Sequence, residues 1–236
     1  MSWTEASTIQ LSLLEWAEEA GWERVCGENL PRVEHDVVID SWAREALLAL
    51  NPELVDEPES ADLVIHEINQ AILDAHNGLV SANERLTVML RGDHSFTTIE
   101  GGHVPRRLID FEALDNNRFT VADEVTISGA VKPRRFDVVY YVNGFPLVVG
   151  ETKTPVKQQV SWVNAARDIH DVYEDEYPNF FATNVFTVAT EGLEFRMAPL
   201  RAVPDPDSEI WAPWGSTQDD PKTVSYTHLR AHETLS

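Results

Sequence analysis

Two acidic residues and a lysine, Asp137, Glu151 and Lys153, stand in a segment whose other residues are mostly apolar. Two carboxylates that meet on apolar strands are costly unless a cation neutralises them. Oxygen ligands suit Mg²⁺, which keeps several waters and binds through one or two carboxylates plus substrate phosphates. Lys153 lies two residues beyond Glu151, so both side chains point to the same face of a strand. The set therefore predicts metal-assisted hydrolysis of a phosphodiester, with the Thr152 carbonyl as a further oxygen ligand.

The segment Arg135–Lys153 is predicted to be a β-hairpin that brings the two acids together. Asn143-Gly144 in its middle is a strong turn signal, because both residues tolerate a positive φ. With a three-residue turn, Asp137 and Glu151 lie directly opposite each other, with Cβ atoms about 5 Å apart. A two-residue turn would instead pair Asp137 with Gly150. The alternative interpretation of the whole set is an ordinary solvated salt bridge at strand ends.

Charge is distributed unevenly along the 236 residues. The net charge is −22, so most of the chain repels nucleic acid. Residues 130–160 are the exception, since five basic residues there outnumber Asp137 and Glu151. These five are Lys132, Arg134, Arg135, Lys153 and Lys157. An anionic partner such as double-stranded DNA would approach here, with Arg134, Arg135 and Lys157 as candidate phosphate contacts. Exposed arginines that only aid solubility are the alternative.

Composition excludes several classes of protein. With 43% hydrophobic and 25% charged residues the chain is typical of a globular protein that can bury a core. One cysteine, Cys26, rules out an intrachain disulfide and a cysteine-based zinc site. The sequence shows no secretory signal and no apolar run long enough to cross a membrane, so we expect a cytoplasmic protein. It lacks a G-x-x-x-x-G-K-[ST] loop, so we expect no ATP binding through such a loop.

The apolar periodicity changes near Gly92, from a helical third to a strand-rich remainder. The predicted helices cover Thr4–Gly21, Ser41–Leu50, Ala61–His76, Val80–Leu90 and Gln158–Tyr173. The predicted strands cover Leu108–Phe111, Phe119–Ile127, Phe136–Val142, Leu147–Lys153, Asn184–Thr190 and Leu193–Met197. This order indicates an α/β (α+β) fold, with a central mixed sheet flanked by helices.

The hairpin resembles the nuclease signature of the type I restriction enzyme R (endonuclease/motor) subunit, a member of the PD-(D/E)xK superfamily. Phe136-Asp137, the run Val-Asn-Gly-Phe-Pro-Leu-Val-Val and Glu151-Thr-Lys153 carry the likeness. Further similar segments are Ala20–Trp22, Leu79–Glu84, Leu108–Glu112, Asn116–Val121, Trp162–Ala165, Asp168–His170 and Thr190–Phe195. The resemblance covers about residues 4–221 and implies a restriction-endonuclease-like sheet.

The resemblance also implies roles for individual residues. Asp137 and Glu151 would be metal ligands for Mg²⁺, and Lys153 the catalytic lysine. The family supports its nuclease with a Gln-x-x-x-Tyr motif, whose tyrosine matches Tyr173. Four residues earlier this sequence has Ile169 in place of glutamine. Glu5 could be an additional acid near the metal, although an acid at a helix N-terminus is also expected for the helix dipole alone.

We interpret the chain as the N-terminal nuclease region of such a subunit. Residues 1–92 would be a helical lead-in packed on the nuclease core, 93–200 the core, 201–223 a linker toward a missing motor domain, and 224–236 a tail of non-native origin. ATP-driven translocation in the full-length enzyme, with methylase (M) and specificity (S) subunits as partners, is implied likewise. The alternatives are another PD-(D/E)xK repair or junction-resolving nuclease, a catalytically decayed subunit-assembly module, or an acidic protein-binding domain without a DNA role.

Overall fold

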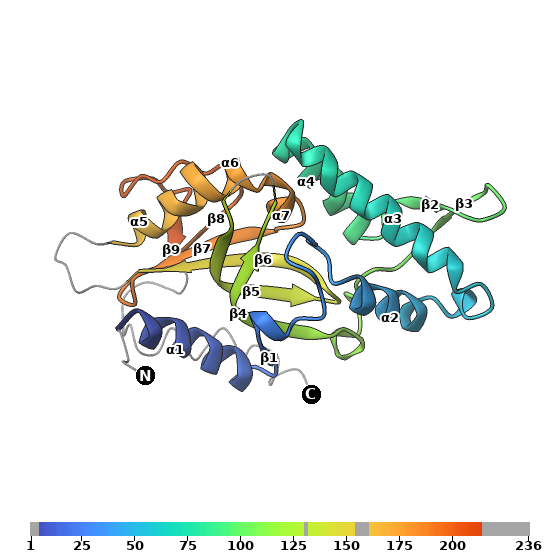
Figure 1. Ribbon diagram of the computed structural model, residues 1–236, viewed down its shortest axis with the longest axis horizontal. Helices are drawn as coiled ribbons and strands as arrows, with labels where there is room; N and C mark the ends of the chain where they lie inside the picture. The colour runs from blue at the N-terminus through green and yellow to red at the C-terminus, as the bar shows by residue number, and fades with distance from the viewer. Residues whose placement is uncertain (1–4, 130–131, 154–160, 214–236) are drawn as a thin grey trace.

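The computed structural model describes residues 5–129, 132–153 and 161–213, with side chains from residue 9 onward. A mixed sheet of seven strands forms its centre, in the order β1-β4-β5-β6-β7-β8-β9 (Figure 1). β1 pairs with β4 and β6 pairs with β7 in parallel, and the other neighbours are antiparallel. The predicted α/β fold with a mixed sheet flanked by helices is therefore confirmed.

The sheet strands are β1 (Glu23–Cys26), β4 (Phe119–Ile127), β5 (Arg134–Val142), β6 (Phe145–Thr152), β7 (Phe186–Thr190), β8 (Phe195–Ala198) and β9 (Ala212–Pro213). A separate hairpin is formed by β2 (Ser95–Thr97) and β3 (His103–Pro105). The helices are α1 (Glu5–Glu19), α2 (Asp40–Leu50), α3 (Glu59–Leu73), α4 (Leu79–Leu90), α5 (Trp162–Arg167), a π-helix (Asp168–Tyr173), α6 (Glu174–Glu176) and α7 (Pro178–Phe181).

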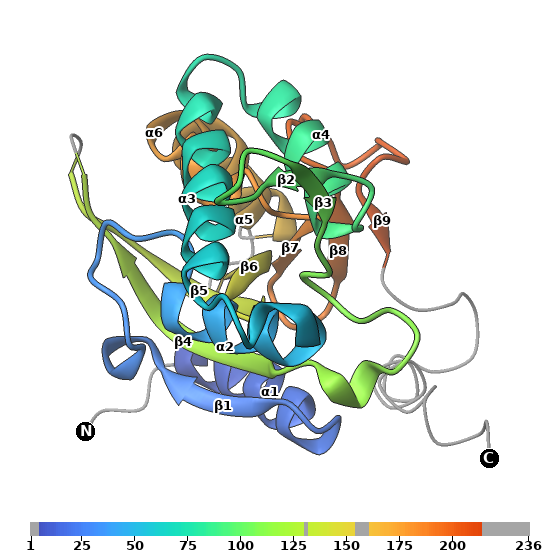
Figure 2. The ribbon, with the colours of Figure 1, turned by 90° about the vertical axis from the view of Figure 1, so that its right-hand side faces the viewer.

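Helices cover both faces of the sheet, as Figure 1 shows, with α1 on one face and α5–α7 on the other. Alternation along β5 explains this arrangement, since successive side chains of a strand point to opposite faces. Val138 belongs to a small core with Leu13 and Leu14 of α1. Val139 and Tyr141 belong to the large core that also contains the buried faces of α2, α3 and α4. The view of Figure 2 shows α3 and α4 beside this second face.

The connection from β6 to β7 carries α5, the π-helix, α6 and α7 over the sheet. Two parallel neighbours require such a crossover, because a tight hairpin can only join antiparallel strands. Ser161 begins the helix with a capping box, in which it and Asn164 satisfy each other's backbone amide groups. The crossover thereby holds one helical face above the end of β6 where Glu151 and Lys153 lie.

The structure corrects several predicted elements. Leu108–Phe111 is not a strand, because Asp110 turns the chain by accepting hydrogen bonds from the backbone of Glu112 and Ala113. The short strands β1 and β9 were missed, and both are edge strands of the main sheet. Trp211 is fully buried beside Trp162, so the segment expected to begin a linker at residue 201 packs on the sheet at least to residue 213. The suspected tail, 224–236, lies outside the described residues.

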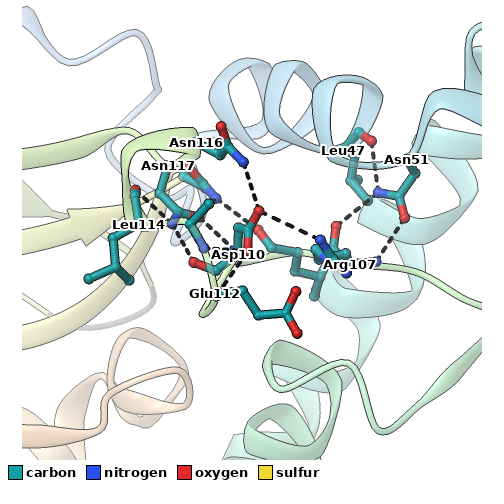
Figure 3. A network of polar contacts seen from close by, with 11 residues as sticks. Leu47, Asn51, Arg107, Asp110, Glu112, Leu114, Asn116 and Asn117 are labelled. Atoms are coloured by element: carbon teal, nitrogen blue, oxygen red, sulfur yellow. Dashed lines mark hydrogen bonds and ion pairs between the residues drawn. The ribbon is translucent and has the colours of Figure 1, made fainter.

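A network of amide side chains ties the turn of the β5–β6 hairpin to the rest of the fold. Asn143 accepts a hydrogen bond from the Arg118 backbone and donates to the Leu108 carbonyl and to Asn117. Asn117 in turn bonds both the amide and the carbonyl of Asp110, as Figure 3 shows in part. The same figure shows Asn51, at the end of α2, bonded to Leu47 and Arg107. These contacts fix the hairpin at the end remote from its charged residues.

Candidate active site

The charged residues of the hairpin meet at its open end, on neighbouring strands. The turn is the two-residue one, with Val142 opposite Phe145, so the predicted three-residue turn is wrong. A bulge between Tyr140 and Tyr141 then shifts the register by one residue, and Val138 lies opposite Gly150. Extended by one residue, this register would place Asp137 opposite Glu151.

Asp137 is held by the strand beside it. Its Oδ2 accepts hydrogen bonds from the Thr152 backbone amide at 2.8 Å and from the Thr152 hydroxyl at 2.7 Å. Its own backbone carbonyl accepts a hydrogen bond of 2.7 Å from the side chain of Gln10, on α1. Two donors on one oxygen fix the orientation of the carboxylate, and Thr152 therefore orients Asp137 through its amide and hydroxyl groups.

Glu151 is buried, with 4% of its surface exposed. Its Oε1 accepts hydrogen bonds from Lys153 Nζ at 2.6 Å and from the Tyr173 hydroxyl at 3.3 Å, whereas Oε2 is buried without a hydrogen-bond partner. Burial, reinforced by the negative charge of Asp137, raises the pKa of Glu151 to about 7. A buried carboxylate oxygen without a hydrogen-bond donor is available to coordinate a cation.

Lys153 lies between two acids from different elements. Its Nζ is 2.6 Å from Glu151 Oε1 and 2.6 Å from Asp168 Oδ2, at the start of the π-helix. Burial disfavours the ammonium, but the carboxylates of Glu151 and Asp168 outweigh this effect and raise the pKa of Lys153. Lys153 is therefore a cation at neutral pH, suited to orienting a water or meeting a phosphate and not to accepting a proton.

The donor set fits a hard divalent cation. Asp137 and Glu151 supply carboxylate oxygens, and one of the Glu151 oxygens has no other partner. Within the described ranges no group of three or more His, Cys, Asp or Glu side chains is arranged to hold a metal. Mg²⁺ does not need a third such side chain, because it usually keeps several waters and uses one or two carboxylates.

Comparison with known proteins decides the family. The family model described as "Type I restriction enzyme R protein N terminus" matches residues 2–204. The chain belongs to this family. A relative from Haemophilus influenzae, the type I restriction enzyme HindI endonuclease subunit, is 29% identical over 92% of this chain and 21% of its own length. A second, from Methanocaldococcus jannaschii and named as an MjaIXP endonuclease subunit, is 26% identical over 48% of this chain and 11% of its own length.

The chain spans about a fifth of the length of the HindI relative and aligns with about a tenth of the MjaIXP relative. The resemblance stated from the hairpin residues is thus confirmed for the R-protein N-terminal family. In the part of the chain that the structure describes, no helix is long and apolar enough to span a membrane.

The predicted residues other than Asp137, Glu151, Thr152 and Lys153 differ in whether the structure places them at the site. The Tyr173 hydroxyl donates a hydrogen bond to Glu151 and so lies at the site. Arg134 is engaged by Glu176 through two hydrogen bonds of 2.5 and 2.7 Å, while Arg135 is 61% exposed and 3.3 Å from Glu124. Two candidates are not placed, because the Glu5 side chain and all of Lys157 lie outside what the structure describes. The position of Arg135 is thus the more accessible for a phosphate.

Asp168 is the site residue that the sequence analysis missed. It lies 15 residues beyond Lys153, and the segment Asp168–His170 was noted only as part of the family likeness. A signal was present, because Asp168 falls five residues before Tyr173 where the motif expects glutamine at four. A residue five positions before Tyr173 can take the place of one four positions before it only where the helix is locally wound with more residues per turn.

The raised pKa of Glu151 predicts a pH-dependent cost to folding. An acid whose pKa is about 7 when folded and 4.5 when unfolded binds a proton on folding, so its burial costs little near pH 4.5 and most above about pH 7. Glu151→Gln removes this cost. We expect urea unfolding in EDTA to show the variant more stable than wild type by about 1 to 3 kcal/mol at pH 8, with the gain shrinking toward pH 5.

The matched control is Glu84→Gln, which changes an exposed acid on α4. It should leave unfolding unchanged at both pH values, because surface substitutions usually have small effects. A gain for Glu151→Gln that is the same at pH 5 and pH 8 would contradict an ionisation cost.

Proposed function

We propose that this chain is the nuclease region of a type I restriction R subunit and that it hydrolyses phosphodiester bonds of double-stranded DNA with Mg²⁺. The observation that carries the proposal is the meeting of Asp137, Glu151 and Lys153 at one end of a hairpin, with a Glu151 oxygen left unpaired. Membership of the R-protein N-terminal family and the endonuclease names of its relatives support it.

In the proposed reaction Asp137 and Glu151 would hold the ion, and the Thr152 carbonyl would be a candidate further ligand. Bound Mg²⁺ would polarise the scissile phosphate and lower the pKa of a coordinated water. Thr152 holds the Asp137 carboxylate in place through two donors. Lys153 stays protonated beside Glu151, so its ammonium can bind a phosphate oxygen and offset the charge that develops there.

The wider biology follows as part of the same proposal. The chain would act within a longer subunit whose motor uses ATP to move DNA, and methylase and specificity subunits would select the sequence. The chain itself has no G-x-x-x-x-G-K-[ST] loop in its 236 residues, so ATP would bind elsewhere in that subunit. Because the rest of the chain is strongly acidic, capture of DNA would depend on those other parts.

Binding of Mg²⁺ to this chain tests the proposal without the complication that ATP also binds Mg²⁺. We expect calorimetric titration at pH 8 to show one site in the wild type and none in Glu151→Gln. Glu174→Gln is the matched control, because Glu174 is also buried with a pKa raised by burial to about 7, but its carboxylate accepts hydrogen bonds from the Arg201 backbone. Absence of binding in all three proteins would favour the decayed assembly module, and equal binding by all three would contradict the ligand role of Glu151.

A further inference from the structure

The helix above the site changes its winding where it passes Lys153. It runs as an α-helix from Trp162 to Arg167, as a π-helix from Asp168 to Tyr173 and again as an α-helix to Glu176. A π-helix bonds each amide to the carbonyl five residues earlier, so one turn takes about one residue more than an α-turn. Single π-turns within α-helices occur frequently at functional sites.

This winding decides which residue lies one turn before Tyr173. In an uninterrupted α-helix that residue would be Ile169, four positions earlier. In the π-helix it is Asp168, five positions earlier, and its carboxylate is 2.6 Å from Lys153 Nζ. Tyr173, on the same side of the helix, reaches Glu151 at 3.3 Å. Asp168 and Tyr173 therefore contact residues that lie close together, at the end of β6 and directly after it.

Ile169 is accounted for by the same geometry. It is 1% exposed and belongs to the large hydrophobic core, so its side chain packs among apolar residues. A glutamine at that position would be buried among apolar side chains. The one-residue expansion thus moves an apolar residue into the core and a carboxylate to the site.

We propose that Asp168 is a positioning residue of the nuclease site, brought by the π-turn to where it holds the Lys153 ammonium in place. The inference rests on the proposed function, since it assigns Asp168 a role through Lys153. A lysine side chain has four rotatable bonds whose freedom is lost when it is held in place, and a single contact with Glu151 leaves several rotamers accessible. Asp168 supplies a second contact to the Lys153 ammonium, from the π-helix.

The first experiment measures DNA cleavage by a complete R subunit that contains this chain, with its partner subunits, ATP and Mg²⁺. We expect Asp168→Asn to lower the single-turnover cleavage rate about 10- to 100-fold, because loss of alignment by about 1 Å has effects of this size. DNA binding and ATP hydrolysis should not change. Asp168→Glu, which keeps the carboxylate, should restore most of the rate.

Asp171→Asn is the matched control on the same π-helix. It removes the same charge, but Asp171 is 58% exposed and pairs with His170 and not with Lys153. It should cleave at the wild-type rate. A loss of rate in Asp171→Asn as large as in Asp168→Asn would show that any charge removed from this helix matters, and would overturn the inference.

The second experiment reads the position of Lys153 without metal, DNA or activity. The chain is treated with a limiting amine-acylating reagent, and modification of Lys153 is measured by mass spectrometry against that of Lys132, an exposed lysine. Release from Asp168 should raise the relative modification of Lys153 in Asp168→Asn at least about threefold, because an amine freed from an ion pair is more reactive. Unchanged modification would contradict the positioning role.

The outcomes separate this inference from the proposed function. If Lys153→Ala and Glu151→Gln cleave DNA like the wild type, the proposed function itself fails. If both lose cleavage while Asp168→Asn keeps the wild-type rate and the wild-type modification of Lys153, only the role of Asp168 fails. Reduced cleavage and increased modification in Asp168→Asn, with rescue by Asp168→Glu, would support the inference.

Discussion

Lys153→Ala in a complete R subunit is expected to lower plasmid cleavage about 10²- to 10³-fold, the effect of removing one group that stabilises developing charge. The lysine is the one cation that the structure places in contact with Glu151, at 2.6 Å. Asp137→Ala should have an effect at least as large, because it removes a proposed metal ligand. The measurement is conversion of supercoiled plasmid to nicked and linear forms over time.

Lys132→Ala is the control for the loss of a positive charge from the same basic segment. Lys132 is exposed, and its part in the structure is a backbone carbonyl that accepts a hydrogen bond from Tyr177. We expect its cleavage rate to stay near that of the wild type. ATP hydrolysis in all three variants should be unchanged, which would show that the subunit is folded and assembled. Undiminished cleavage in both Lys153→Ala and Asp137→Ala would refute the assigned site.

Gly144→Ala is expected to destabilise the fold by about 3 to 5 kcal/mol, within the range for mutations that introduce a backbone clash. Gly144 has a φ of +85°, and a Cβ there would lie 2.6 Å from the Ile39 carbonyl oxygen. It would also lie 3.2 Å from the Ala43 amide nitrogen. Neither group can move without displacing the start of α2, whose approach is fixed by a hydrogen bond from the Ile39 amide to the Gly144 carbonyl.

Gly101→Ala separates the clash from the cost of the left-handed backbone. Gly101 has a similar φ of +81°, but a Cβ there would meet nothing within 4 Å. It should therefore cost only about 1 to 2 kcal/mol, the penalty for a non-glycine residue in this conformation. Urea unfolding of both variants measures the difference. Equal losses of stability would show that contact with α2 is not what demands glycine at position 144.

The hairpin shows how far sequence reasoning reaches. Alternating apolar residues and the Asn143-Gly144 pair predict the two strands and their turn, which the structure confirms. The length of the turn was predicted wrongly, yet Asp137 still comes opposite Glu151 in the extended register because a bulge beside Tyr141 adds the missing residue. A bulge leaves no clear sign in one sequence, since it depends on how both strands pack against the layers above and below them.

Elements whose form depends on distant contacts were not predictable in the same way. Leu108–Phe111 is apolar enough for a strand, but hydrogen bonds donated by Asn116 and Asn117 hold Asp110 in a turn. The edge strand β1 has only four residues and pairs with β4, far away in the sequence. The π-helix at Asp168 accompanies burial of Ile169 and contact with Lys153, which become visible only when the sheet and the crossover helix are assembled.

The amide network around Asn143 and Asn117 has a consequence for how the protein responds to its surroundings. Its contacts are mostly between neutral groups, which ionic strength affects little, and hydrogen bonds led by that from Asn116 hold the pKa of Asp110 below its usual range. The cluster around Lys153, by contrast, consists of charges that salt, acid or an approaching polyanion will perturb. Strand alignment is thus insulated from electrostatic changes around Lys153, and titrating one end of the hairpin need not loosen the other.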